Sequence, residues 1–194
     1  IYTVPSTGGR ASQITTNPAH DTKPIWSPDG KKIAFASDRM GSMDIFEVNK
    51  EGGIPKRLTT HSGNETPVAY KDAGHILFLA NIMPTAEDAQ FPSGQFQQVY
   101  EVNTEGGRPI LFSSMPMEDI SINHTGNTLL YHDKKGYEDP WRKHHTSSIT
   151  RDIWLCSLNG NRTFRKQTAF NGEDRTPVWA SDDKSFYYLS EEKG

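Results

Sequence analysis

Short apolar stretches recur along the chain and are separated by turn-forming residues. One complete unit reads Pro24–Trp26, Lys32–Ser37, Asp44–Val48 and Arg57–Thr59. Aromatic and β-branched residues are frequent in these stretches, as is typical of β-strands. The sequence therefore predicts a unit of four short strands, which we name a, b, c and d in chain order.

Two kinds of turn divide the unit. Ser27-Pro28-Asp29-Gly30 predicts a tight turn between strands a and b, because proline presets its own φ and glycine accepts a positive φ. A glycine pair follows three of the four predicted c strands, and it predicts the turn into strand d. These pairs are Gly8-Gly9, Gly52-Gly53 and Gly106-Gly107.

The same order of strands and turns repeats along the whole chain. The repeats span approximately residues 1–20, 21–62, 63–115, 116–171 and 172–194, and the first and last are half repeats. Within them the further strands are expected at 1–4, 66–70, 75–80, 97–102, 109–112, 118–122, 127–132, 152–158, 165–168, 176–181 and 185–189. Four-stranded units repeated at this spacing predict an all-β fold, a β-propeller of four-stranded antiparallel blades.

The chain begins with strands c and d of one blade and ends with strands a and b of another. We expect a single propeller domain or propeller fragment of three full blades and two half blades, as part of a six-bladed ring. If residues 1–4 paired with residues 185–189, the alternative would be a closed four-bladed ring. Helical solenoids are excluded because no stretch keeps a helical hydrophobic period.

Two units carry long insertions between strands b and c. They span approximately residues 81–96 and 133–151, whereas the first full unit has only residues 38–43 there. In a four-stranded meander the b–c loops and the d–a connectors leave the blade at one edge, so both insertions are expected on the same face. Binding residues concentrate on variable loops held by a rigid scaffold, and this face is therefore the expected binding face.

The insertions supply the candidate binding residues. Aromatic and arginine side chains often anchor protein interfaces, although Tyr137 and Trp141 could instead pack their loop onto its own blade. No metal is expected at the adjacent histidines, because neighbouring residues of an extended segment point to opposite sides. The candidates are Phe91, Phe96, Tyr137, Trp141, Arg142, His144 and His145.

The amino-acid composition argues against several classes of protein function. The net charge of −3 disfavours a nucleic-acid-binding surface, and no apolar run is long enough to cross a bilayer. The single cysteine, Cys156, excludes an internal disulfide and is expected in the core. Asp38, Asp44 and Asp152 stand at strand ends, where we expect them to accept backbone N–H bonds. The sequence has no recognised catalytic or phosphate-binding motif, so no catalytic residue, metal or cofactor is assigned.

Residues 24–35, Ser37-Asp38-Arg39 and Asp44-Ile45-Phe46 resemble the repeat of TolB-like propellers. Residues 136–142, 150–154, 172–179 and 186–190 resemble the amino-terminal propeller of bacterial tricorn-type serine peptidases. This second resemblance implies a non-catalytic module ahead of PDZ and peptidase domains of the same polypeptide. The turn at residues 181–184 departs from the pattern, since proline and glycine are lost, and it is expected to be looser.

Three functions remain open. The first is a propeller that binds or gates peptides or proteins for a tricorn-like peptidase, in the periplasm or otherwise outside the cytoplasm of a bacterium. The second is a stand-alone TolB-like adaptor that binds a protein partner in the periplasm. The third is a propeller sugar lyase, which is motivated only by the scattered histidines.

Overall fold

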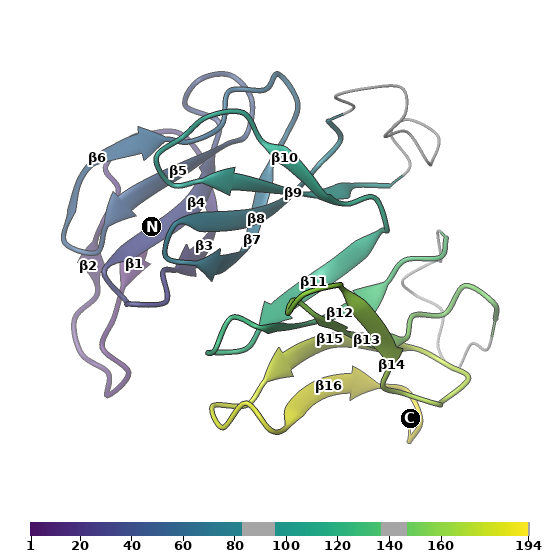
Figure 1. Cartoon of the computed structure of the whole chain (residues 1–194). Coiled ribbons are helices and arrows are strands. Elements are labelled where there is room, and N and C mark those ends of the chain that lie inside the picture. Colours follow the sequence, from purple (N-terminus) through teal and green to yellow (C-terminus); the bar gives the residue numbers. More distant parts are fainter. Residues whose placement is uncertain (83–95, 137–146, 194) are drawn as a thin grey trace. The chain divides into compact units, whose positions relative to one another are not determined.

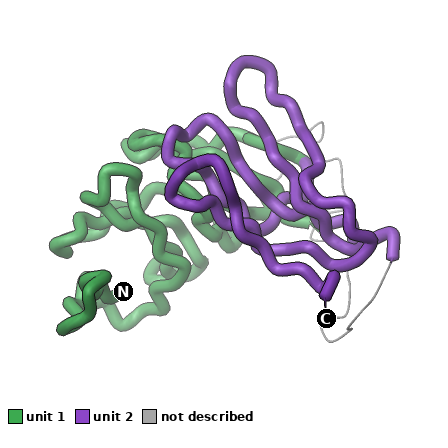
Figure 2. The backbone as a smooth tube through the Cα atoms, turned by 90° about the horizontal axis from the view of Figure 1, so that it is seen from below, with its two compact units in different colours: residues 1–114 green, residues 115–194 purple. Residues whose placement is uncertain are grey.

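A computed structural model describes residues 1–82, 96–136 and 147–193. All regular secondary structure in these residues is β-strand (Figure 1). The chain divides into two compact units, residues 1–114 and residues 115–194, which are coloured separately in Figure 2. We describe each unit by itself.

The first unit holds a half blade and two full blades. The half blade pairs β1 (Tyr2–Thr3) with β2 (Ser12–Gln13). In each full blade the four strands follow one another across an antiparallel sheet. The first full blade consists of β3 (Asp21–Trp26), β4 (Lys32–Ser37), β5 (Asp44–Asn49) and β6 (Gly52–Arg57). The second consists of β7 (Thr66–Asp72), β8 (His75–Ala80), β9 (Gln98–Asn103) and β10 (Ile110–Ser113).

The second unit holds the third full blade and a further half blade, so the expected three full blades and two half blades are confirmed. The full blade again has its strands in sequential antiparallel order, and the half blade has two strands. The full blade consists of β11 (Met117–Ile122), β12 (Thr128–Asp133), β13 (Ile153–Ser157) and β14 (Thr163–Lys166). The half blade consists of β15 (Asp174–Trp179) and β16 (Phe186–Ser190).

The central strands of each full blade form the core. In the first unit β4, β5, β8 and β9 are buried over almost their whole length. One cluster joins the two full blades, with Ala34 and Ile45 from the first blade beside Ile76 and Phe78 from the second. A blade that packs on both faces buries successive residues of its central strands, so these strands read as apolar runs and are easily recognised in the sequence. Cys156 is fully buried, as expected.

The outer strands of the first and third full blades lie earlier in the sequence than predicted, whereas β10, Ile110–Ser113, lies one residue later than the predicted 109–112. In the first full blade the turn is Lys50-Glu51, and the glycine pair opens β6 instead of forming the turn. Gly52 and Gly53 keep the positive φ values, 91° and 112°, that favour glycine at these positions. In the third blade the outer strand is β14, Thr163–Lys166, and not residues 165–168. Strands β6 and β14 are largely exposed and carry no apolar pattern. The outer strand of the first blade was therefore predicted around Leu58, a buried apolar residue that follows β6.

The turn at residues 181–184 is as tight as its counterparts, so the expected looser turn is wrong. The Asp183 N–H donates to the Ala180 carbonyl oxygen at 3.2 Å, as the Gly30 N–H donates to the Ser27 carbonyl oxygen at 2.9 Å. Asp183 takes the left-handed conformation of Gly30, with a φ of 55° against 65°. Aspartate is one of the few residues besides glycine that adopt this conformation readily.

The first strand of a blade contains a bulge at a repeated position. The pairing register shifts between Thr22 and Ile25, between Glu118 and Ser121, and between Arg175 and Val178. Lys23, Asp119 and Thr176 lie within these bulges and have positive φ values of 51°, 48° and 54°. A bulge re-aims side chains and increases the local twist of the strand.

Candidate functional site

The long connections leave the blades where the sequence predicted them. They are residues 81–97 between β8 and β9 and residues 134–152 between β12 and β13, against residues 38–43 between β4 and β5. Each connection emerges at the blade edge that also carries the connectors to the next blade. We call this edge of a blade the connector edge.

Most candidate binding residues lie outside the described part of the chain. These are Phe91, Tyr137, Trp141, Arg142, His144 and His145. Phe96 is described, and it is a half-buried residue just ahead of β9. The binding role of all these side chains therefore stays a prediction.

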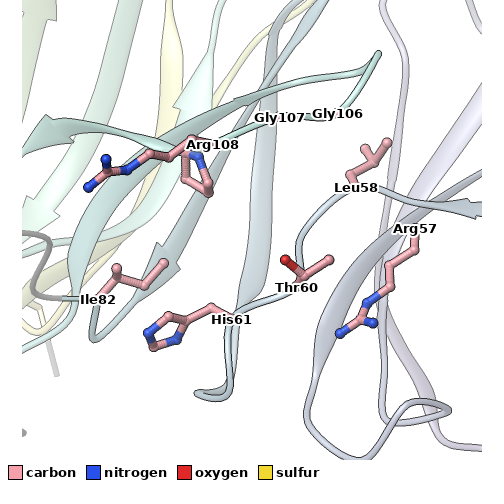
Figure 3. A pocket seen from close by; sticks show the side chains of 9 residues that line it. Arg57, Leu58, Thr60, His61, Ile82, Gly106, Gly107 and Arg108 are labelled. Atoms are coloured by element: carbon pink, nitrogen blue, oxygen red, sulfur yellow. The ribbon is translucent and has the colours of Figure 1, made fainter.

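A pocket of about 670 Å³ lies in the first unit at the junction of its two full blades. The first blade contributes the end of β6 and the connector to β7, and the second blade contributes Ile82 and the segment ahead of β10 (Figure 3). Leu58, Ile82 and Pro109 supply apolar walls, while two arginines, a threonine and a histidine supply polar ones. The full lining consists of Arg57, Leu58, Thr60, His61, Ile82, Gly106, Gly107, Arg108 and Pro109.

The polar groups of this pocket are donors of hydrogen bonds. Arg57 Nη2 lies 2.8 Å from Asp44 Oδ2, and the Arg57 Nε atom has no hydrogen-bond partner in the described residues. His61 Nδ1 accepts a bond from the Gly63 N–H at 3.0 Å, which leaves Nε2 as the protonated nitrogen of the neutral ring. Arg108 is exposed and forms no ion pair with the described residues.

Two fully buried acids, Asp44 and Glu65, stand behind Arg57. Thr59 Oγ1 accepts a bond from the Ile45 N–H at 2.9 Å and donates one to Glu65 Oε2 at 2.6 Å. Burial raises the pKa of Glu65 to about 7, against the hydrogen bond from Thr59, and the charge of Asp44 adds to the increase. The threonine thereby ties strand c of one blade to the first residues of the next.

The same threonine position recurs in other blades. Thr168 Oγ1 accepts a bond from the Ile153 N–H at 3.2 Å in the second unit. Thr15 Oγ1 accepts a bond from the Ile1 amino group at 2.6 Å in the first half blade. We call Thr15, Thr59 and Thr168 the blade-end threonines. These threonines could have been recognised in the sequence, because each lies a short distance ahead of a predicted strand a.

A smaller hollow of about 370 Å³ occupies a comparable position in the second unit. It also lies beside the end of an outer strand, and it is lined by Lys135, Ser147, Ser148, Thr150, Asp152, Lys166, Phe170 and Asn171. Asp152 Oδ1 lies 2.8 Å from Lys166 Nζ, and Asp152 Oδ2 lies 2.5 Å from Lys135 Nζ. Lys135 Nζ also lies 3.5 Å from Asp133 Oδ2, so both cations of this hollow are already paired with carboxylates of the chain itself.

The three strand-end acids have different partners. Asp38 Oδ1 accepts a bond from the His20 N–H at 2.9 Å, as predicted. The prediction is wrong for Asp44 and Asp152, which pair with cationic side chains in the described part of the structure. In the outer strand, Arg57 faces Phe46 and Lys166 faces Trp154, so each cation lies diagonally across from the acid two residues before the residue that it faces.

A polar network in the second unit holds the bulge at Thr176. The Thr176 N–H donates to His132 Nδ1 at 3.1 Å, and the Thr176 hydroxyl donates to Asp119 Oδ2 at 2.8 Å. His132 Nδ1 is therefore unprotonated, and Nε2 donates to Glu118 Oε2 at 3.3 Å. The hydrogen bond from His132, with that from Lys134, lowers the pKa of Glu118 to about 2. The sequence indicated His132 only as an ordinary blade histidine, whereas it is almost fully buried here.

Two features of the described residues bear on metal binding and on membranes. Across residues 1–82, 96–136 and 147–193, no group of three or more His, Cys, Asp or Glu side chains is arranged to hold a metal ion. The same residues contain no helix that is long and apolar enough to span a membrane.

Comparison with known proteins identifies the family. The family model of the tricorn protease N-terminal beta propeller domain matches residues 1–194. Tricorn protease homolog 1 of Streptomyces coelicolor is 24% identical over 195 residues, which cover 100% of this chain and 17% of that protein. The Tol-Pal system protein TolB of Bordetella pertussis is 43% identical over 54 residues, which cover 27% of this chain and 12% of that protein.

A solved structure agrees at the level of the fold. A putative TolB from Agrobacterium tumefaciens superposes with a TM-score of 0.62 at 22% identity, over 97% of this chain and 65% of that one. The chain spans about a sixth of the length of the tricorn protease homolog that it matches. Since the family model matches the chain from end to end, the chain belongs to the family of tricorn protease N-terminal β-propeller domains.

Proposed function

We propose that this chain is a non-catalytic propeller module that binds or gates peptides or proteins for a tricorn-like peptidase. The observation that carries the proposal is the open pocket of about 670 Å³ in the first unit. Its volume falls within the range usual for ligand sites, and it combines apolar walls with a few polar groups. Family membership and the length of the tricorn protease homolog support the assignment to a longer peptidase.

The polar groups of the pocket suit binding better than hydrolysis. Arg57, Arg108 and His61 offer hydrogen-bond donors, and no serine or cysteine lines the pocket. Nucleophilic catalysis needs a nucleophile within hydrogen-bond reach of a general base, and the Thr60 hydroxyl of the lining has no hydrogen bond to a base in the described residues. We therefore expect the peptidase and PDZ domains that the family resemblance implies to be further partners within the same polypeptide.

The test uses the polypeptide that carries this chain, at its natural length. Fluorescent peptides with blocked ends are titrated against it, and a serine-reactive probe is applied in parallel with mass spectrometry of the labelled residue. We expect saturable peptide binding that persists after probe labelling, with the label outside the residues of this chain. Absence of binding by any peptide, or probe labelling of a serine of this chain, would contradict the proposal.

A second candidate is a TolB-like adaptor that binds a folded protein in the periplasm. The short match to TolB, at 43% identity over 54 residues, favours it. Fractionation of the source cells separates the two candidates. An adaptor is expected in the periplasmic fraction together with a stable protein partner and without affinity for short peptides.

A further inference from the structure

We infer that the pocket between the end of β6 and the segment ahead of β10 binds the carboxylate of an acidic side chain in a peptide. This inference rests on the proposed function, because it names which peptides the module would select. It is carried by the cavity, by the charges on its walls and by the groups that remain without partners there.

The charged side chains on the pocket walls are all positive. Arg57, Arg108 and His61 line the cavity, and no acidic residue does. Asp44 neutralises Arg57 from behind, but its carboxylate is fully buried and does not line the pocket. Arg108 has no acidic partner in the described residues, and it therefore supplies the uncompensated charge.

The donors of the pocket fit the geometry of a carboxylate. A guanidinium group presents parallel N–H donors that match the two oxygens of a carboxylate. Arg108 is exposed and has no ion pair in the described residues, and the neutral His61 ring carries its proton on Nε2. A carboxylate would satisfy these donors, whereas an uncharged amide would bring N–H groups of its own against them.

The apolar walls argue for a peptide side chain over an inorganic anion. Leu58 is buried at the base of the pocket, and Ile82 and Pro109 flank it. Gly106 and Gly107 leave the opposite wall without side chains, and a Cβ on either would meet no atom within 4 Å. Figure 3 shows the side chains of Leu58 and Ile82 coming from different segments of the lining, and the pocket they help to line has a volume of about 670 Å³.

The test compares two acetylated and amidated hexapeptide pools that differ only in one Glu or Gln position. We expect the natural-length polypeptide to bind the Glu pool about tenfold more tightly in fluorescence anisotropy, since one charge-assisted hydrogen-bonded pair is worth this much. The Arg108→Gln variant is expected to abolish the preference for the Glu pool. Arg108 is exposed, so this variant is expected to fold, and thermal unfolding checks that it does.

Arg10→Gln is the matched control, because Arg10 is an exposed arginine of the same unit that does not line the pocket. Equal affinity of the two pools, or an equal loss of preference in the Arg10→Gln variant, would overturn the inference and leave the proposed function standing. Failure of both pools and of all other blocked peptides to bind would instead overturn the proposed function.

Discussion

Glu65 is a carboxyl group with no exposed surface in the structure, and Thr59 is the only described side chain that donates a hydrogen bond to it. Burial raises its pKa from the ordinary 4.5 to about 7. The folded chain therefore holds this proton more tightly than the unfolded chain does. The stability that the proton confers is complete below pH 4.5 and is lost as the pH rises through about 7.

Because the pKa of Glu65 is raised in the folded chain, stability is expected to fall as the pH rises. Between pH 4.5 and about 7 the free energy of unfolding is expected to fall by up to about 3 kcal/mol through Glu65 alone. The Glu65→Gln variant, which cannot ionise, is expected to lose this part of the pH dependence. Urea unfolding of both proteins at pH 5 and pH 8 measures it, and identical pH dependence in the two would contradict the account.

The pKa of Glu118 is shifted in the opposite direction, and stability depends on pH in the opposite sense. The hydrogen bond from His132 lowers its pKa to about 2, so the stabilisation is present above pH 4.5 and is lost as the pH falls towards 2. Glu118→Gln is expected to lower the free energy of unfolding at pH 7 by about 1–2 kcal/mol, because partial exposure of the side chain screens the interaction. At pH 2 the variant and the parent are expected to converge.

The control for Glu118 is Glu192→Gln, at an exposed glutamate of the same unit. Urea unfolding at pH 7 and at pH 2 is the measurement. A loss of stability in Glu118→Gln that is equally large at both values would mean that the loss does not come from the ionised carboxylate.

At the scale of the strand and its connector, the blade-end threonines make the same kind of hydrogen bond in several blades. Thr59 satisfies a backbone donor of β5 and the buried Glu65 at once. Valine has nearly the shape of threonine, but Thr59→Val removes the hydrogen-bond partner of the β5 backbone donor and that of Glu65. It is expected to lower the free energy of unfolding by about 1–3 kcal/mol. Thr60→Val is the neighbouring control, at an exposed position, and is expected to cost less than about 0.5 kcal/mol. Equal thermal unfolding of the two variants would refute this role.

The turn at Asp183 gives a further prediction at this scale. Its carboxylate accepts bonds from the His124 N–H at 2.9 Å and the Thr125 N–H at 3.1 Å, in the neighbouring blade. Asp183→Gly relieves the positive φ but removes both bonds, so the unfolding temperature is expected to fall. Asp183→Asn keeps an acceptor oxygen and tolerates the conformation, and it is expected to retain most of the stability. A glycine variant that melts at a higher temperature than the parent would contradict this account.

The elements that could be predicted from the sequence are those that pack on both faces. The range of β8 was predicted as observed, and β4 likewise, because apolar runs between turn residues define both ends. The outer strands β6 and β14 were displaced in the prediction, since exposed positions accept almost any residue. The register bulges at Lys23, Asp119 and Thr176 were not predicted, and the last two are joined by a hydrogen bond between residues 57 positions apart, which no local pattern reveals.

At the scale of the whole molecule, the repeat predicted the blade architecture because every blade uses the same order of strands and turns. The number of blades in a complete ring stays a prediction. The pocket in the first unit was not predicted, because Arg57, Ile82 and Arg108 come from separate strand ends that only the packing of two blades brings together. The insertions that the sequence singled out keep their predicted binding role without a test from the described residues.

The central claim is that the pocket in the first unit is a peptide-binding surface, and photo-crosslinking tests it most directly. A blocked peptide with a photoreactive leucine analogue beside a glutamate is irradiated with the natural-length polypeptide, and mass spectrometry locates the adducts. We predict adducts within residues 57–61 and 106–109, around the pocket in the first unit. Adducts that fall only outside this chain, or only at the opposite blade edge near residues 27–30, would contradict the claim.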